Sequence, residues 1–167
     1  KGTIDATLPN AEQIIMADEK EAAEHVSVVE LISEDLSRVS SDVRVDRYRY
    51  VDRLHTNKGD LLQTSSEVSG LLPADYPGRL GEIIDAQLPA GSITGAPKAK
   101  TVEVIRDAEH YDRGYYTGIM GIYDRGNLNT GVMIRFLEQD AHGMCYKAGG
   151  GVTSQSVCRK EYEEVIR

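Results

Sequence analysis

Pro89-Ala-Gly-Ser-Ile-Thr-Gly-Ala-Pro-Lys98 is the stretch on which the organisation of this 167-residue chain depends. Its Gly, Pro, Ser and Thr residues stand directly before a run with helical spacing, expected to form a helix over residues 98–108. Small residues let backbone N–H groups approach a ligand, and the N-terminus of a helix favours an anion. No Gly-Lys-Ser/Thr follows at P-loop spacing. From these residues alone, an anion site and a plain loop before a helix both stay open.

Around this segment the sequence predicts one α+β domain over residues 1–167, with helices packed against antiparallel strands. Asp18 is placed to cap a helix with Glu21 at its N3 position, after a polar connection at residues 7–16. Helical and strand periodicities define the other elements. The expected strands are 43–51, 61–72, 118–123, 130–137 and 144–148, and the expected later helices are 79–88 and 154–167. A turn is expected at 57–60 and a hairpin turn at 124–127.

Composition restricts the class of partner. The formal net charge is −8, which argues against nucleic acid, because a phosphate backbone is bound by clustered Lys and Arg. The arginines at 44, 47, 49 and 53 alternate with acids, so they indicate a solvated strand face. No apolar run approaches the roughly 20 residues of a membrane helix, and no secretory signal pattern is visible. We therefore expect a cytoplasmic protein with no membrane partner, whose Cys145 and Cys158 are reduced.

Two pairs of carboxylates recur at i, i+3 spacing. Glu21 and Glu24 lie in the first turns of the expected first helix, and Glu161 and Glu164 lie in the last helix. Two carboxylates on one helix face are suited to a hard cation. Acidic residues are also favoured in the first turn of a helix by its dipole. The pattern alone leaves a cation site and a solvated acidic turn as alternatives.

Gly91-Ser-Ile-Thr-Gly-Ala-Pro-Lys98 is similar to the signature of the chorismate-utilising enzymes, which include aminodeoxychorismate, anthranilate, isochorismate and salicylate synthases. The similarity continues in family order over nearly the whole chain. The further blocks are Lys20-Glu-Ala-Ala-Glu-His25, Asp35-Leu-Ser-Arg-Val39, Ser66-Glu-Val68, Gly118-Ile-Met-Gly-Ile-Tyr123, Gly126-Asn-Leu-Asn-Thr130, Ile134-Arg135, Ala148-Gly-Gly-Gly151 and Glu161-Tyr-Glu-Glu164. The resemblance implies that the chain forms about half of the family's α/β sandwich and is a C-terminal fragment of the full domain. It also implies that the fragment is inactive alone, because the family's upstream catalytic Glu lies before residue 1.

Lys1 carries the subfamily assignment. It stands before Gly2-Thr3, where aminodeoxychorismate synthases have Lys and anthranilate synthases have Ala. In the former, this Lys is proposed to attack C2 of chorismate and expel the 4-hydroxyl, after which ammonia displaces it. The nucleophile must be a neutral amine. The resemblance therefore favours component I of aminodeoxychorismate synthase, a transferase of folate biosynthesis that forms the precursor of p-aminobenzoate.

The resemblance also implies a set of site residues and partners. Magnesium is expected at Glu24 and Glu164, with Glu21 and Glu161 as outer carboxylates. Arg135 and the amides near Gly149 and Gly151 are expected to bind a chorismate carboxylate. The other expected substrate contacts are Tyr116, Ser92, Thr94 and Gln63. The expected partners are chorismate and a glutamine amidotransferase subunit that supplies ammonia.

Two departures from the family pattern keep alternatives open. Gln63 replaces a His that lies near the departing hydroxyl, and Gln can donate a hydrogen bond there but cannot transfer a proton at neutral pH. Ser33-Glu34 replaces an Arg-Asn pair. Anthranilate synthase component I is the nearest rival, and isochorismate and salicylate synthases rank lower. A non-catalytic chorismate-binding or regulatory module is the alternative from another class.

Overall fold

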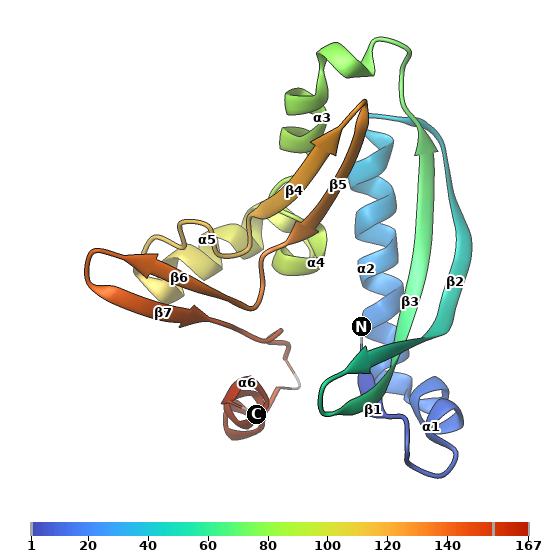
Figure 1. The fold of residues 1–167 in the computed structure, drawn as a ribbon, viewed down its shortest axis with the longest axis vertical. Helices are drawn as coiled ribbons and strands as arrows, with labels where there is room; N and C mark the ends of the chain where they lie inside the picture. The colour runs from blue at the N-terminus through green and yellow to red at the C-terminus, as the bar shows by residue number, and fades with distance from the viewer. Residues whose placement is uncertain (1, 155, 167) are drawn as a thin grey trace. The chain divides into compact units, whose positions relative to one another are not determined.

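The computed structural model describes residues 2–154 and 156–166, without the side chain of Glu164. The chain divides into two units, Lys1–Val104 and Ile105–Arg167. Helix α5 (Lys98–Glu109) crosses the boundary between them (Figure 1). The first unit contains β1 (Thr3–Asp5), α1 (Ala11–Ala17), α2 (Glu19–Ser37), β2 (Ser41–Thr56), β3 (Gly59–Leu71), the 3-10 helix η1 (Tyr76–Gly78), α3 (Leu80–Gln87) and α4 (Gly91–Thr94). The second contains β4 (Ile119–Asp124), β5 (Asn127–Val132), β6 (Phe136–Asp140), β7 (Gly143–Lys147) and α6 (Cys158–Ile166).

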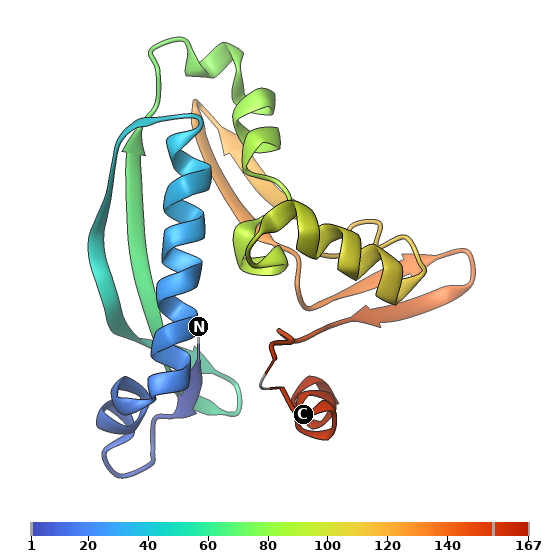
Figure 2. The same ribbon diagram turned by 180° about the vertical axis from the view of Figure 1, so that it is seen from behind.

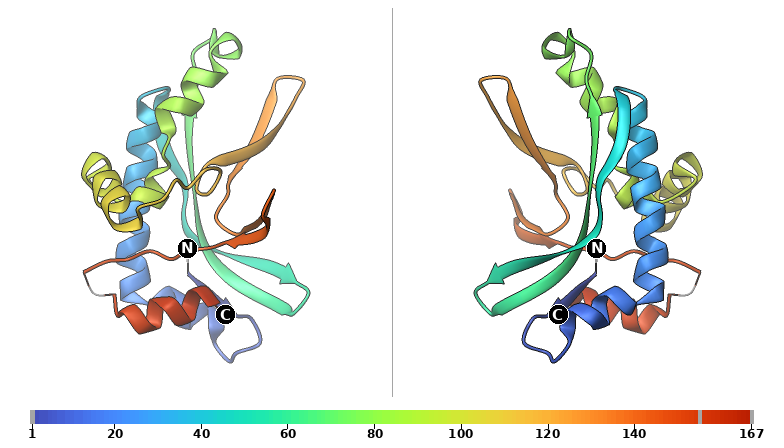
Figure 3. Two further views of the ribbon diagram at one scale, coloured as in Figure 1. Left: turned by 90° about the vertical axis from the view of Figure 1, so that its left-hand side faces the viewer. Right: turned by 90° about the vertical axis from the view of Figure 1, so that its right-hand side faces the viewer.

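The first unit is an antiparallel sheet in the order β1-β3-β2, with α2 lying along one face (Figures 1 and 2). The β2–β3 hairpin is long and strongly curved, as the side views show (Figure 3). Its turn lies where the sequence predicts it, with Thr56 opposite Gly59. Apolar residues from α1, α2, β3 and α3 form the core, namely Ala11, Ile15, Val29, Leu62 and Ile83. The expectation of an α+β fold built on antiparallel strands is confirmed.

Helix α2 begins at the predicted cap. The Asp18 carboxylate accepts a hydrogen bond from the backbone N–H of Glu21 at 2.9 Å, which satisfies one of the free donors of the first turn. From there the helix runs 19 residues and buries His25 and Val29. The cap therefore sets the start of the element that carries both Glu21 and Glu24.

Replacing Asp18 by Ala is expected to destabilise the first unit by about 1 kcal/mol, because the N–H of Glu21 loses its acceptor. Urea unfolding followed by far-UV circular dichroism measures the shift. Glu30→Ala, an exposed change on the same helix, is the control and is expected to have little effect. Equal midpoints for the two variants would contradict the capping role.

The prediction of a polar connection at residues 7–16 was wrong, because helix α1 occupies Ala11–Ala17. Its apolar side is narrow, with Ala11 and Ile15 buried and the residues between them exposed. The expectation that Arg49 lies on a solvated strand face was also wrong. Its guanidinium donates to the carbonyl oxygens of Ile15, Met16 and Asp18 at 3.1, 3.0 and 3.2 Å. Arg49 thus satisfies free carbonyls at the C-terminal end of α1.

An irregularity in β2 allows this use of Arg49. The register between β2 and β3 shifts between Arg47 and Tyr50, and Arg49 adopts a φ of 44°. The Ser66 hydroxyl oxygen accepts a hydrogen bond from the Arg49 backbone N–H at 2.8 Å. The same oxygen lies 2.6 Å from Nε2 of the buried His25. The bulge therefore links the sheet to both α1 and α2.

The second unit contains two separate hairpins, β4–β5 and β6–β7, followed by α6. The predicted turn at residues 124–127 is confirmed, with Arg125 and Gly126 at φ 48° and 86° as a type I′ turn requires. The predicted continuous strand over residues 130–137 was wrong. Strand β5 ends at Val132 and β6 begins at Phe136, because β6 pairs with β7 and not with β4. Arg135 therefore lies in the bend between two hairpins.

Within residues 2–154 and 156–166, none of the helices combines the length and the apolar character that crossing a bilayer requires.

Candidate functional site

The segment at residues 89–98 docks against helix α2. Residues 91–94 form the single helical turn α4, so the expected loop contains a short helix before α5 begins at Lys98. Gly91 is buried, and a Cβ there would lie 2.9 Å from Leu31 Cβ and 3.2 Å from Asp35 Oδ2. Glycine is therefore the residue that allows the backbone of α4 to lie directly on α2.

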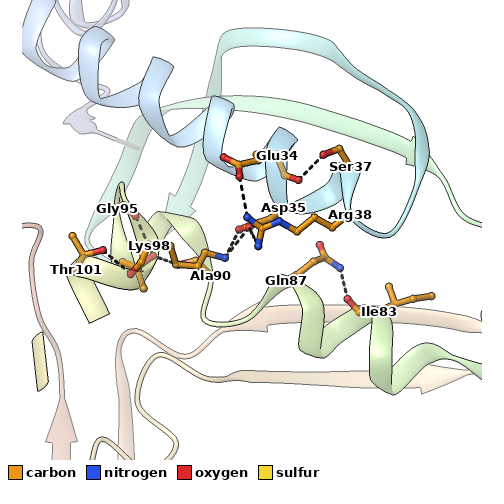
Figure 4. A network of polar contacts seen from close by, with 11 residues as sticks. Glu34, Asp35, Ser37, Arg38, Ile83, Gln87, Ala90, Gly95, Lys98 and Thr101 are labelled. Carbon is orange, nitrogen blue, oxygen red and sulfur yellow. Dashed lines mark hydrogen bonds and ion pairs between the residues drawn. The ribbon is translucent and has the colours of Figure 1, made fainter. Parts of the chain in front are cut away.

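An ion pair fixes the other end of the segment. Lys98 Nζ lies 2.7 Å from each carboxylate oxygen of Asp35 (Figure 4). The two side chains are only 18% and 7% exposed, and Arg38 Nη1 lies 3.6 Å from the same carboxylate. Because the Lys98 ammonium is held by Asp35, the cation of this segment serves the packing of α2 against the start of α5.

The hydroxyls of the segment differ in their surroundings. Thr94 is buried, and its Oγ1 lies 3.4 Å from the carbonyl oxygen of Ala90 and 3.3 Å from that of Gly95. Ser92 is exposed. Thr94 therefore supports the local backbone in this structure, whereas the Ser92 hydroxyl is accessible to a ligand. Substrate contact by either residue stays a prediction.

The acidic face of α2 has one carboxylate oxygen in an unusual environment. Glu21 Oε2 is buried and has no hydrogen-bond partner among the described residues. It lies against Gly2, where a Cβ would come within 2.7 Å of it. Glu24, one helical turn further on, has Oε1 3.8 Å from Lys20 Nζ. A buried carboxylate oxygen without a donor is costly unless a cation or donor binds it, so Glu21 fits a hard cation.

Residues of α2 and β3 line an open hollow of about 510 Å³. It is lined by apolar residues of α2 and by hydroxyl groups of β3, together with His25 and Tyr50. Gln63 lies on the same strand, paired with Thr3 of β1, and its Nε2 donates to Ser65 Oγ at 3.3 Å. The Gln63 side chain is half-buried, and this hydrogen bond holds its amide in place on β3. An amide N–H group held in this way can donate a hydrogen bond to a ligand.

In the second unit the structure brings together Tyr116 and Gly149. A Cβ on Gly149 would collide with the Tyr116 hydroxyl oxygen, so the phenol lies directly on the glycine backbone. Burial raises the pKa of Tyr116, while the charges of Arg113 and Arg135 act on the same phenol in the opposite direction. Arg135 is exposed, and a Cβ on Gly151 would meet nothing within 4 Å.

Not all predicted ligands are placed by the structure. Lys1 and the side chain of Glu164 lie outside the described residues. Glu21 and Glu24 belong to the first unit and Glu161 to the second. Within the described residues, no group of three or more His, Cys, Asp or Glu side chains is arranged to hold a metal ion. The magnesium ligands therefore stay a prediction.

Two charged pairs were not anticipated from the sequence. Asp35 follows Val28 and Leu31 at helical spacing, so a charged residue lies on an otherwise apolar helix face. This charged position is the feature of the sequence that indicates a buried partner for Asp35. Arg113 and Glu109 are spaced i, i+4, and the guanidinium donates to both carboxylate oxygens at 2.7 and 2.6 Å. Hydrogen bonding from Arg113 holds the pKa of Glu109 below its usual range, so this pair is intact at neutral pH and is lost only as pH falls through that lowered value.

The arrangement of the chain is that of a known class of α+β domain. It superimposes with a TM-score of 0.72 on a Bacillus anthracis protein assigned as the 2,3-dihydroxybenzoate-specific isochorismate synthase DhbC. The match covers 99% of this chain and 44% of that protein at 22% identity, so it establishes the fold. The model of the chorismate binding enzyme family matches residues 1–167, and the chain belongs to that family.

Individual relatives agree with this membership. The chain is 48% identical over its full length to an uncharacterized PabA-like protein of Pasteurella multocida, of which it covers 52%. It is 36% identical to anthranilate synthase component 1 of Synechocystis, with 96% of this chain and 32% of that protein aligned. The chain thus spans about half of the length of the first relative and about a third of the second.

Proposed function

We propose that this chain is the C-terminal part of an aminodeoxychorismate synthase component I, which aminates chorismate at C4 for the synthesis of p-aminobenzoate. The observation that carries the proposal is Lys1 in front of Gly2-Thr3, within an ordered set of family blocks. Family membership supports a chorismate-binding enzyme. The PabA-like name of a relative at 48% identity supports the p-aminobenzoate branch.

In this proposal each side chain has a limited task. The Lys1 amine bonds to C2 of chorismate as the ring double bond shifts and the 4-hydroxyl leaves. Ammonia from a glutamine amidotransferase subunit then bonds to C4 as the double bond shifts back and the C2–N bond to Lys1 breaks. Arg135 and the amides of residues 149–151 bind a carboxylate of the substrate, which suits a planar fork and backbone donors. Gln63 donates a hydrogen bond to the departing hydroxyl, and the proton that this oxygen needs comes from another group.

Magnesium belongs to the same proposal. The orphaned Glu21 oxygen supports a cation on the acidic face of α2, where Glu24 would hold it together with Glu164, and Glu161 would be an outer carboxylate. When bound, such an ion supplies positive charge that grips and orients a substrate carboxylate. The protein's part is to hold the buried Oε2 of the half-buried Glu21 against Gly2, which fixes the position of this carboxylate.

Anthranilate synthase component I is the second candidate. Several relatives with 32–37% identity carry that name, among them the protein of Synechocystis. The two reactions start from the same substrate and use the same ammonia source, so the products separate them. A chorismate-binding module without turnover is the remaining alternative.

The deciding experiment uses the full-length protein that carries this chain, supplied with chorismate, ammonium and magnesium. We expect aminodeoxychorismate, identified by mass and chromatography, and a loss of at least about a hundredfold in rate for Lys1→Ala, because the nucleophile is removed. Chelation of magnesium by EDTA is expected to abolish turnover as well. Lys58→Ala, an exposed lysine in the β2–β3 turn, is the control.

The other outcomes assign the chain elsewhere. Anthranilate with release of pyruvate would establish the rival synthase. Chorismate binding without any product would establish the non-catalytic module.

A further inference from the structure

Arg113 is the centre of a compact network in the second unit that none of the assigned roles uses. Its Nε and Nη2 bind both oxygens of Glu109, and its Nη1 donates to Thr117 Oγ1 at 3.1 Å. The Thr117 hydroxyl in turn donates to the carbonyl oxygen of Tyr116 at 2.6 Å. One guanidinium therefore connects the last turn of α5 to the backbone that carries Tyr116.

The same guanidinium also contacts the Tyr116 ring. Its Cζ lies 5.3 Å from the ring centroid, within the range of a cation–π interaction. Arg113 thus restrains the face of the Tyr116 ring. The backbone next to Tyr116 is restrained by Thr117, whose N–H donates a hydrogen bond to the carbonyl oxygen of Met133 at 2.8 Å. The arrangement restricts the direction of the phenol, which ends on Gly149.

The Arg113 pair differs from ordinary surface pairs of the same spacing. The side chains of Arg113 and Glu109 are 24% and 29% exposed, and the pair is bidentate. Arg159 and Glu163 on α6 are also spaced i, i+4, but they are 87% and 44% exposed and share one contact. A partly buried, bidentate ion pair keeps its geometry better than an exposed ion pair with a single contact.

We propose that Arg113, fixed by Glu109, is a positioning residue for the substrate-binding glycine run. Through Tyr116 it holds the backbone at Gly149 so that the amides of residues 149–151 are preorganised for a carboxylate of the substrate. The role of these amides rests on the proposed function. The restraint of the run by Tyr116 and Arg113 rests on the contacts described above.

The restraint is tested first without substrate, by mass-resolved amide hydrogen exchange on the full-length protein. Arg113→Met is expected to raise exchange in the peptide spanning residues 144–152 by about tenfold, and Arg113→Lys by less, since Lys keeps the charge but cannot form the fork. Exchange in the peptide spanning residues 119–132 reports on the β4–β5 hairpin and should stay unchanged. Arg159→Met is the matched control and should alter neither peptide.

The functional role is tested by steady-state kinetics with chorismate. We expect Arg113→Met to raise KM about tenfold with little change in kcat, because the amides bind the carboxylate equally in the ground state and the transition state. Arg113→Lys should recover part of the loss. A variant that loses kcat without any change in KM, or unchanged exchange at residues 144–152, would overturn the inference.

The two proposals fail in different ways. Absence of turnover in the parent protein contradicts the proposed function and removes the substrate role of the amides. Turnover in the parent with the same KM in Arg113→Met overturns the positioning role alone.

Discussion

Replacing Lys98 by Met is expected to lower the free energy of unfolding of the first unit by about 3 kcal/mol. The change leaves the Asp35 carboxylate, only 7% exposed, without its main partner, and an unpaired buried charge is strongly destabilising. Arg38 at 3.6 Å compensates only in part. Urea unfolding followed by circular dichroism gives the shift in midpoint.

Two further variants separate the ion pair from a general effect of losing a lysine. Lys100→Met removes a cation from the same helix, where its pair with Glu103 is 71% and 62% exposed, and should cost less than about 0.5 kcal/mol. The double variant Asp35→Leu, Lys98→Met removes both charges and should recover much of the lost stability. Equal losses for Lys98→Met and Lys100→Met would show that the pair does not hold the segment on α2.

The substitution Gly91→Ala is expected to destabilise the first unit by about 1–3 kcal/mol, since the added Cβ must displace Leu31 or the Asp35 carboxylate. Ala normally stabilises a helical position relative to Gly. The sign of the effect therefore tests whether the backbones of α4 and α2 are in direct contact. The same urea unfolding assay measures it.

Gly81 supplies the matched control within α3. A Cβ at Gly81 meets nothing within 4 Å, so Gly81→Ala is expected to stabilise the protein by about 0.5–1 kcal/mol. Opposite shifts for the two glycines support the close approach at Gly91. A stabilising Gly91→Ala would contradict it.

Local patterns in the sequence predicted local structure well. The cap at Asp18, the turn at residues 57–60 and the hairpin turn at residues 124–127 each depend on neighbours within a few positions. Two expectations failed because tertiary contacts decide them. Helix α1 has too narrow an apolar side to be visible in a polar stretch, and strand pairing of β6 with β7 breaks the alternation at Arg135.

The candidate site shows the same division. Helical spacing correctly placed Glu21 and Glu24 on α2, but the orphaned oxygen of Glu21 depends on Gly2, which is far away along the chain. The Lys98 ammonium binds the carboxylate of Asp35, 63 positions earlier. No local pattern reveals a partner at that separation. The family resemblance predicts Tyr116 and Gly149 as site residues, and the structure shows that the Tyr116 phenol lies against the Gly149 backbone.

The hydrogen bonds from Arg49 to the end of α1 determine when α1 can become stable while the chain is being synthesised. Helix α1 has seven residues, which is too short to persist by itself in water. The guanidinium that holds its end comes from 31 to 34 positions later, and the bulge that directs Arg49 needs Ser66. Although α1 leaves the ribosome before β2 and β3, it acquires lasting structure only after β3 has been made and paired. Nascent chains that stop before Ser66 should therefore present residues 11–17 as an unstructured, protease-sensitive segment.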